Sequence, residues 1–148
     1  MKDKPRILFL CTGNSCRSQM AEGFCREFHG EVFHCSSAGL ETHGLNPRAV
    51  KVMAEVGVDI SGHSSKTVDD LEGAPFDYVI TVCGHAGETC PWFPGGTAVL
   101  HRGFEDPPGL TREMGSEDDI LKVYRRVRDE IGNWVRDPPK TLPHCPPA

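Results

Sequence analysis

A chain of 148 residues, 38% of them hydrophobic and 25% charged, has the size and composition of one globular domain with its own core. A formal net charge of −5 argues against broad nucleic-acid binding and against attraction to anionic membrane surfaces. No apolar run approaches the roughly 18–20 residues that a membrane span needs, and no leader cleavage site precedes the first motif. We therefore expect a cytoplasmic monomer that binds neither nucleic acid nor membrane.

The first third of the chain alternates strand and helix patterns. The apolar run at residues 6–11 (RILFLC) predicts a strand buried on both faces of a parallel sheet. Apolar residues recur at helical spacing over 18–29, and residues 32–37 predict a second strand that ends in a turn of small residues. The segment before residue 18 therefore joins the carboxyl end of a strand to the start of a helix.

The same alternation continues to the end of the chain. Asn46 and Pro47 predict the start of a second helix, which a glycine ends. Residues 76–83 (FDYVITVC) and 97–100 (TAVL) predict the third and fourth strands. Residues 116–119 match a capping box at the start of a long amphipathic helix, and a proline-rich tail follows that helix.

Strands that alternate with helices predict an α/β fold. We expect a single catalytic domain over residues 1–137, with a central four-stranded, mostly parallel sheet flanked by helices, and a flexible tail over 138–148. In such sheets, ligands bind beyond the carboxyl ends of the strands. Cys11 and Cys83 both lie at such strand ends.

Seven cysteines are many for a chain of this length. Their odd number and the lack of a secretory signal argue against a fixed disulfide framework. We interpret Cys25 and Cys35 as core residues, Cys16 as packing inward, and Cys145 as an exposed tail cysteine without a function. The candidates for chemistry are the other three, Cys11, Cys83 and Cys90.

Residues 11–18, CTGNSCRS, have the spacing C-x5-R-S between a strand and a helix. A loop that enters a helix N-terminus directs successive backbone N–H groups and the positive end of the helix dipole at one point. Arg17 supplies a planar fork for two oxygens of a tetrahedral anion. The same field favours the thiolate form of Cys11, which makes it a nucleophile. The alternative is a packing cysteine before an ordinary helix start.

Three loop residues have specific expected tasks. The Ser18 hydroxyl donates to the Cys11 sulfur, the Asn14 side chain bonds the loop backbone, and Gly13 allows backbone conformations that a β-carbon would hinder. The expected oxyanion-binding residues are Thr12, Gly13, Asn14, Ser15, Cys16, Arg17 and Ser18.

The segment CTGNSCRSQMAEG resembles the phosphate-binding loop of the low-molecular-weight tyrosine phosphatase fold and, more narrowly, the loop of the thioredoxin-coupled arsenate reductases built on that fold. The likeness covers nearly the whole chain, through SAGLETHGLNPRAV (37–50), VGVDIS (56–61), TVCGHAGETCP (81–91) and RRVRDEIGNW (125–134). The resemblance implies arsenate as substrate, phosphate and sulfate as competing oxyanions, thioredoxin as electron donor, and no cofactor.

Cys83 and Cys90 lie seven residues apart after the third predicted strand, with two glycines between them. Once arsenate is attached to Cys11, attack by Cys83 on the Cys11 sulfur expels As(III) and leaves a disulfide. Cys90 then takes over that disulfide by thiol–disulfide exchange, a relay for which a phosphatase has no use. The alternatives are two structural cysteines or a zinc site with His85, although zinc sites favour four ligands at other spacings.

Attachment of arsenate requires a proton for the leaving hydroxyl, so a carboxylic acid is expected to face the loop. Asp106, in GFEDPP, follows the fourth predicted strand and matches the Asp-Pro general acid of the resembled family. Glu105 is the second choice, and an ordinary turn aspartate is the alternative. Phosphatases of this fold carry an aromatic residue where Pro108 stands, which weakens the phosphatase interpretation.

Some reductases of the resembled family bind potassium through residues that match Asn14, Glu22, Ser37 and one further acidic residue. Lys66 occupies the acidic position in this chain. Its ammonium group would repel the cation and pair with Glu22 in its place, so we predict no metal site and no potassium dependence. We interpret His63, in the same region, as a surface histidine.

The sequence therefore favours an arsenate reductase with five catalytic residues, Cys11, Arg17, Cys83, Cys90 and Asp106. A phosphatase of low activity that uses the same loop is the second hypothesis. A redox or oxyanion sensor, in which the cysteines report oxidation to a partner, is a third and non-enzymatic one.

Overall fold

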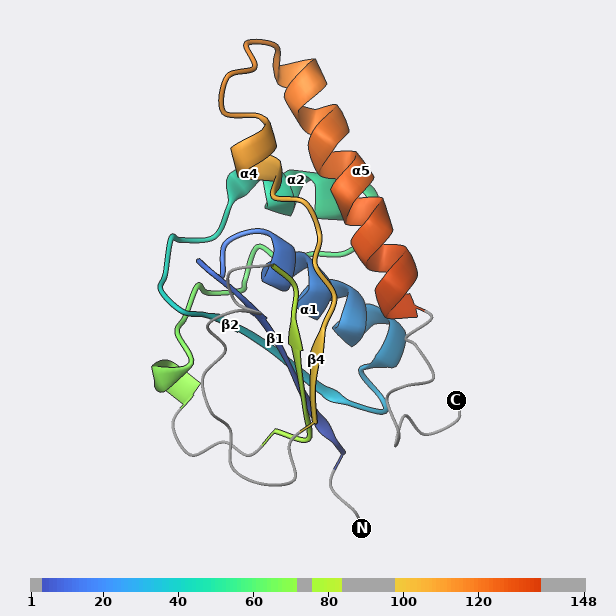
Figure 1. Ribbon diagram of the computed structural model, residues 1–148. Coiled ribbons are helices and arrows are strands. Elements are labelled where there is room, and N and C mark those ends of the chain that lie inside the picture. Colours follow the sequence, from blue (N-terminus) through green and yellow to red (C-terminus); the bar gives the residue numbers. More distant parts are fainter. Residues whose placement is uncertain (1–3, 72–75, 84–97, 137–148) are drawn as a thin grey trace.

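In the residues that the computed structural model describes (4–71, 76–83 and 98–136), the central sheet has four parallel strands (Figure 1). The strands are β1 (Arg6–Cys11), β2 (His34–Gly39), β3 (Tyr78–Thr81) and β4 (Ala98–His101). Their order across the sheet is β2-β1-β3-β4. The predicted α/β fold is confirmed. The sheet was predicted to be mostly parallel, and every strand pair in the described residues is parallel.

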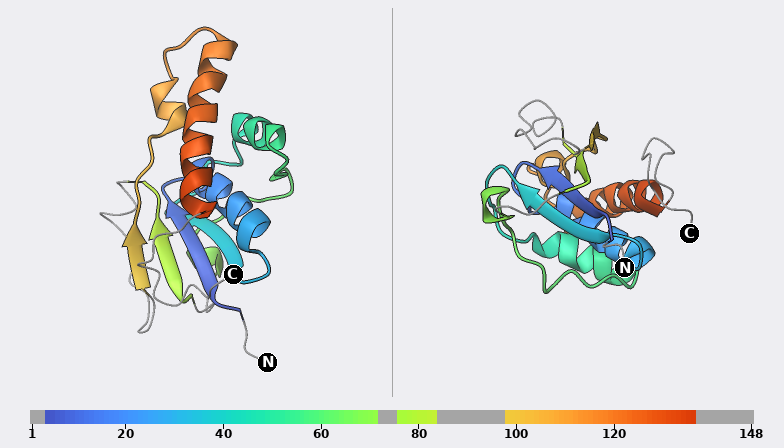
Figure 2. Two further views of the ribbon diagram at one scale, coloured as in Figure 1. Left: turned by 90° about the vertical axis from the view of Figure 1, so that its right-hand side faces the viewer. Right: turned by 90° about the horizontal axis from the view of Figure 1, so that it is seen from below.

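The longer helices of the described residues lie on one face of the sheet (Figure 2). They are α1 (Arg17–His29), α2 (Pro47–Glu55) and α5 (Glu117–Arg136). Helix α1 packs on β1 and β2, and α5 packs against both α1 and α2. None of the helices in this part of the chain is long and apolar enough to cross a membrane.

Strand β1 positions the functional end of the molecule. It lies between β2 and β3, and residues 7–11 are buried, which accounts for the continuous apolar run in the sequence. Because the strands are parallel, the carboxyl ends of β1 and β3 open at the same edge of the sheet. The amide of Val82 donates to the carbonyl of Leu10 at 2.9 Å, so Cys83 leaves β3 beside the loop that follows Cys11.

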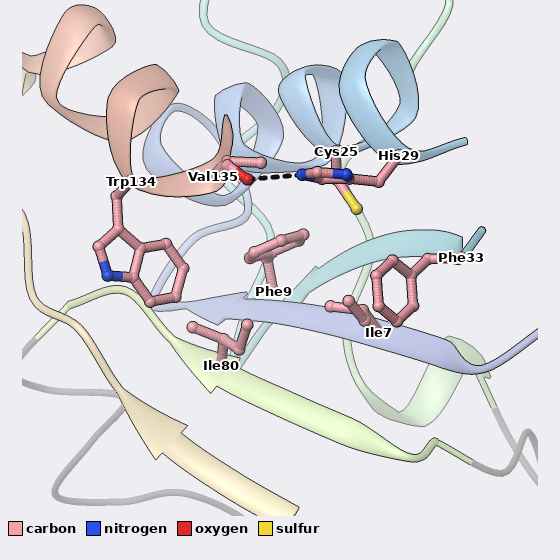
Figure 3. A pocket seen from close by; sticks show the side chains of 8 residues that line it. All are labelled: Ile7, Phe9, Cys25, His29, Phe33, Ile80, Trp134 and Val135. Carbon is pink, nitrogen blue, oxygen red and sulfur yellow. Dashed lines mark hydrogen bonds between the residues drawn. The ribbon is translucent and has the colours of Figure 1, made fainter. Parts of the chain in front are cut away.

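The core between the sheet, α1 and the end of α5 contains a small apolar cavity (Figure 3). Its volume of about 10 Å³ is roughly enough for one water molecule and too small for a substrate. The side chains of Phe9 and Ile80 face it from the sheet, and Trp134 faces it from α5. At its margin, Nε2 of His29 lies 2.8 Å from the carbonyl of Val135 and ties α1 to α5.

The helix boundaries follow the capping signals. The Asn46 side chain accepts from the amides of Arg48 and Ala49 at the start of α2, and Gly57 beyond its end has a φ of +81°. The first strand was predicted with its observed bounds, whereas the other three are shifted or shortened by a few residues. Two short elements were not predicted, the 3₁₀ turn η1 (Asp69–Leu71) and the four-residue helix α4 (Pro107–Leu110), because neither is long enough to show a periodic apolar pattern.

One prediction about the cysteines is wrong. Cys25 and Cys35 are buried, as expected of core residues, but they form a disulfide between α1 and β2, with their Cα atoms 6.1 Å apart. The ten-residue separation carries no signal for this pairing, because it depends on how the helix packs on the strand. Cys90, His85, Cys145 and the tail 138–148 lie outside the described residues.

Candidate active site

The loop between β1 and α1 is held in place by hydrogen bonds that its carbonyl groups accept from a neighbouring segment. The carbonyls of Cys11, Thr12, Gly13 and Ser15 accept from the amides of Leu40, Glu41, His43 and Asn46, at 3.0–3.2 Å. These donors belong to the segment 40–46, which runs directly from the end of β2. Gly39 permits the close approach, since a β-carbon there would lie 2.7 Å from the amide nitrogen of Asn14. The segment 40–46 therefore acts as a template for the loop.

The outward carbonyls determine where the loop amides point. In a trans peptide the C=O and the following N–H point in opposite directions, so carbonyls bound to the template leave their paired amides facing the other way. In the described part of the chain, no amide of residues 12–16 has a hydrogen-bond acceptor. These amides and the start of α1 form the expected binding site for an anion.

Asn14, and not Gly13, has the unusual backbone conformation. Its φ is +47°, in the left-handed region, and its fully buried side chain is completely satisfied. The amide group donates to the hydroxyls of Ser18 (2.9 Å) and Ser37 (3.0 Å), while Oδ1 accepts from Gln19 (3.0 Å) and from the amide of Lys66 (2.8 Å). Gly13 leaves room for the imidazole of His43, and a β-carbon there would force that exposed ring to turn away.

The nucleophile candidate has a defined hydrogen-bond partner. The Sγ of Cys11 lies 2.8 Å from the Ser18 hydroxyl, which is the contact expected from the sequence. Ser18 accepts a hydrogen bond from Asn14, so its own proton is available for the sulfur. Both side chains are buried, and a hydroxyl that donates to sulfur stabilises the thiolate form.

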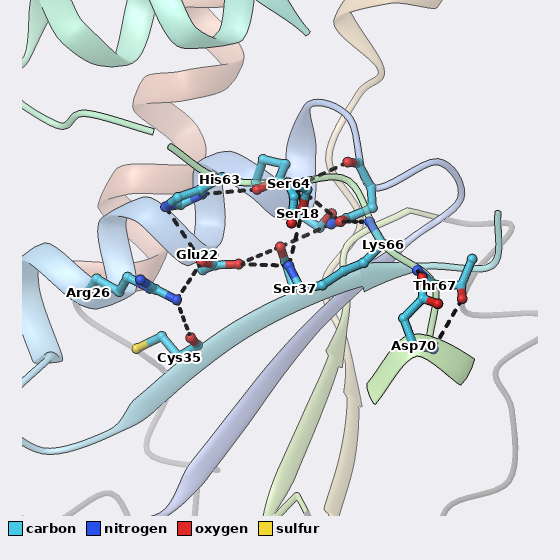
Figure 4. Close-up of polar contacts among 12 residues, drawn as sticks. Ser18, Glu22, Arg26, Cys35, Ser37, His63, Ser64, Lys66, Thr67 and Asp70 are labelled. Carbon is cyan, nitrogen blue, oxygen red and sulfur yellow. Dashed lines mark hydrogen bonds and ion pairs between the residues drawn. The ribbon is translucent and has the colours of Figure 1, made fainter. Parts of the chain in front are cut away.

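Glu22 is the centre of a buried polar cluster behind the loop (Figure 4). It accepts from the Ser37 hydroxyl at 2.6 Å and lies 2.9 Å from Arg26 and 3.8 Å from Nζ of Lys66. The predicted pairing of Lys66 with Glu22 is thus present. His63 is not a surface residue as predicted: its side chain is only 11% exposed, and burial lowers its pKa.

Arg17 and Asp106 form an ion pair in the cavity that Cys11 lines. Nη1 of Arg17 donates to the carbonyl of Phe104 at 3.1 Å, and Nη2 lies 3.4 Å from Oδ1 of Asp106. Both residues line the same cavity as Cys11. Glu105, the second choice for the acid, pairs with Arg126 on α5 at 3.0 Å and does not line the cavity.

Cys83 contacts the loop between β1 and α1 (residues 12–16, the candidate anion loop) through Thr12. The Thr12 hydroxyl lies 3.3 Å from the Sγ of Cys83, which is buried. The structure therefore brings two of the three candidate thiols, Cys11 and Cys83, to one edge of the sheet. The third, Cys90, lies outside the described residues, so its place in the relay stays a prediction.

Cys16 lies inside the loop but is a poor nucleophile. It is buried, and that burial raises the pKa of its thiol far above the ordinary value, which keeps it protonated.

Among the described residues, no cluster of His, Cys, Asp or Glu could hold a metal ion.

Comparison with known proteins identifies the fold family. A family model described as low molecular weight phosphotyrosine protein phosphatase matches residues 6–142. The chain belongs to this family. The arsenate reductase of Halalkalibacterium halodurans is 47% identical over 134 residues, which are 90% of this chain and 94% of that protein.

Solved structures of the same family have the same fold. An arsenate reductase in the phosphate binding state is similar to this chain with a TM-score of 0.71 at 32% identity, over 88% of this chain and 93% of that one. The thioredoxin-dependent arsenate reductase of Corynebacterium glutamicum is similar with a TM-score of 0.63 at 30% identity, over 89% of this chain and 60% of that one.

In this member of the phosphatase family, Cys11 lines a cavity together with residues of the loop, Arg17 and Asp106. Its volume is about 370 Å³, and its lining also includes His43, Asn46, Pro108 and Arg112. Among the described residues that line it, none is Phe, Tyr or Trp. The part of the wall that the described residues form therefore offers no Phe, Tyr or Trp ring to pack against an aryl phosphate.

Several residues that shape the site were not predicted. Gln19, His43, Asn46 and Arg112 have no place in the C-x5-R-S pattern, because they act from neighbouring segments. His43 and Asn46 do fall in the resembled segment SAGLETHGLNPRAV, which is the signal in the sequence that points to them.

Proposed function

We propose that this chain reduces arsenate to arsenite with a relay of three thiols, and that thioredoxin restores the reduced protein. The main observation behind this proposal is that Cys11 and Cys83 meet at the same loop. Cys11 lines the cavity with the loop residues, and the Sγ of Cys83 lies 3.3 Å from the hydroxyl of Thr12. Relatives that are themselves named arsenate reductase, one of them thioredoxin-dependent, support the proposal.

The first step forms an arsenic–sulfur bond. Arsenate is held by the loop amides and by Arg17, and the Cys11 thiolate, stabilised by Ser18, attacks arsenic. Asp106 gives its proton to the departing hydroxyl, which leaves as water. Arg17 contacts both Phe104 and Asp106, so one side chain aligns the acid and the anion.

The second step transfers two electrons. The Cys83 thiolate attacks the Cys11 sulfur, a disulfide forms, and the arsenic–sulfur bond breaks with its electron pair on arsenic, which leaves as arsenite. Cys90 then attacks Cys83, Cys11 departs as thiolate, and the Cys83–Cys90 disulfide is reduced by a dithiol. Phosphate and sulfate match the shape of arsenate and compete with it for the loop. The protein acts as a monomer.

Turnover with thioredoxin tests this proposal. Purified protein is assayed for arsenate-dependent NADPH oxidation with thioredoxin and thioredoxin reductase, and arsenite is quantified in a single turnover without reductant. We expect Cys83→Ser to release no arsenite and Cys90→Ser to release one arsenite per chain without further turnover. Cys145→Ser is the control and retains full turnover.

Two outcomes would contradict the reductase. One is a wild-type protein that does not turn over arsenate, and the other is a Cys90→Ser variant with full multiple turnover. A phosphatase would instead hydrolyse an aryl phosphate at rates unaffected by both serine substitutions. A sensor would turn over neither substrate.

A further inference from the structure

Asn46 connects the wall of the active site to a helix that carries no catalytic residue. Its backbone amide donates to the carbonyl of Ser15 at 3.1 Å, and its Oδ1 caps α2. That leaves the Nδ2 group, which donates to the hydroxyl of Tyr124 at 3.1 Å. Tyr124 lies on α5, 78 residues further along the chain.

This bond differs from the other supports of the loop. Leu40, Glu41 and His43 follow β2 closely, so the sheet sets their positions. Asn46 is the template residue furthest from β2, and its side chain is anchored by α2 and by Tyr124. The Tyr124 side chain is 1% exposed, and burial raises its pKa, so the hydroxyl remains neutral and keeps this bond.

We propose that Tyr124 is a positioning residue for the anion loop, which it orients through Asn46 and the carbonyl of Ser15. The carbonyl of Ser15 and the amide of Cys16 share one peptide plane and point in opposite directions. Fixing the carbonyl therefore fixes the direction in which the Cys16 amide faces the anion. The proposal deepens the proposed function and rests on it only for the identity of the natural anion.

The test measures the binding of inorganic phosphate by titration calorimetry. Tyr124→Phe removes one hydroxyl and keeps the buried ring, and we expect its dissociation constant for phosphate to rise by roughly fivefold, the effect of one hydrogen bond. Tyr78→Phe is the matched control, because Tyr78 is an equally buried tyrosine at the opposite end of the parallel strands, and it should bind phosphate like the wild type.

A second variant separates positioning from packing. Asn46→Ser keeps a neutral helix cap and removes the donor to Tyr124, so it should also weaken phosphate binding, and the double variant should bind no more weakly than Asn46→Ser alone. With phosphate bound, hydrogen exchange at the Cys16 amide should be faster in Tyr124→Phe than in the wild type, and unchanged in Tyr78→Phe. In arsenate turnover, KM should rise while kcat changes little.

The proposal is overturned if Tyr124→Phe binds phosphate as the wild type does, or if the effects of the two substitutions simply multiply. It is also overturned if the wild type does not bind phosphate at all, or if Tyr124→Phe lowers the melting temperature without changing phosphate affinity. A wild type that binds phosphate but does not reduce arsenate would end the proposed function and leave this inference standing.

Discussion

The hydroxyl of Thr12 lies 3.3 Å from the sulfur of Cys83, so the candidate anion-binding loop contacts the thiol that acts second in the proposed relay. The two residues are 71 positions apart in sequence and meet because β1 and β3 are adjacent and parallel. When Cys83 is a thiolate, the hydroxyl has to be the donor, since a thiolate has no proton to give. In the proposed relay, this contact would both place and stabilise the nucleophile of the second step.

Removal of this hydroxyl should slow the release of arsenite. A hydrogen bond to a charged group contributes about 1.5–3 kcal/mol, so Thr12→Val should reduce the rate of single-turnover arsenite release by roughly tenfold or more. Phosphate affinity should stay close to the wild-type value, because the loop amides remain. Thr12→Ser keeps the hydroxyl and serves as the control; equal losses in both variants would contradict the assigned role.

The Ser18 hydroxyl should control the reactivity of Cys11. In Ser18→Ala the sulfur loses its 2.8 Å partner, and we expect alkylation of Cys11 by iodoacetamide at neutral pH to slow by roughly five- to tenfold. Peptide mass mapping follows Cys11 separately from the other cysteines. Ser15→Ala alters a serine of the same loop without touching the sulfur and should react at nearly the wild-type rate. An unchanged rate in Ser18→Ala would rule the stabilising contact out.

The disulfide between Cys25 and Cys35 should stabilise the fold without taking part in turnover. It closes a short loop, which by chain entropy is worth roughly 2–3 kcal/mol. The double variant Cys25→Ser/Cys35→Ser should lose about that much free energy of unfolding in urea and keep its arsenate turnover. Digestion without reductant should yield one linked pair of peptides that contain these cysteines; two separate peptides would show that the bond is absent.

Turnover should not depend on potassium. Glu22 is buried and already has Arg26 at 2.9 Å and Lys66 at 3.8 Å as positive partners. Replacement of KCl by choline chloride at constant ionic strength should therefore leave kcat and KM unchanged. A severalfold rise in turnover with potassium would refute the prediction. Lys66→Gln removes one of the two positively charged partners of Glu22, and we expect its melting temperature to fall below the wild-type value. The turnover of this variant is then measured with and without potassium.

The contact between α2 and α5 should make stability depend on pH in the acid range. Hydrogen bonds from Arg125 at 2.8–2.9 Å are the main cause that lowers the pKa of Glu55 from its ordinary 4.5 to about 2, and Arg128 adds to them. Because the folded-state pKa lies below the unfolded one, the ionised carboxylate stabilises the folded state. That contribution is complete above pH 4.5 and disappears as the pH falls through about 2.

A charge-neutral variant measures this effect directly. The melting temperature of Glu55→Gln should lie furthest below the wild-type value near pH 7, and the difference should close as the pH falls toward 2. Glu31→Gln makes the same chemical change at an exposed position and should show little difference at any pH. A gap for Glu55→Gln that stays constant with pH would contradict the ion pair as its cause.

Much of the fold and of the anion loop follows from the sequence itself. The run RILFLC is apolar because β1 is buried on both faces. The residues from Cys11 to Ser18 are contiguous, so the sequence presents the candidate nucleophile, the arginine and the helix start together. Asn46 and Ser116 could be predicted as helix caps because a cap forms hydrogen bonds with amides within three residues of itself. Interactions of this range depend on local spacing, which the sequence shows directly.

Only the tertiary structure decided the contacts between distant segments. The pairing of Cys25 with Cys35, the bond of Thr12 to Cys83 and the bond of Asn46 to Tyr124 each depend on how a helix or strand packs against its neighbour. The contact between Gly13 and the ring of His43 likewise joins two segments that are apart in the sequence. The sequence by itself predicted which residues would bind and attack an oxyanion, and the packing of segments far apart in the chain decided how those residues are held, since their separation leaves no periodic or local signal.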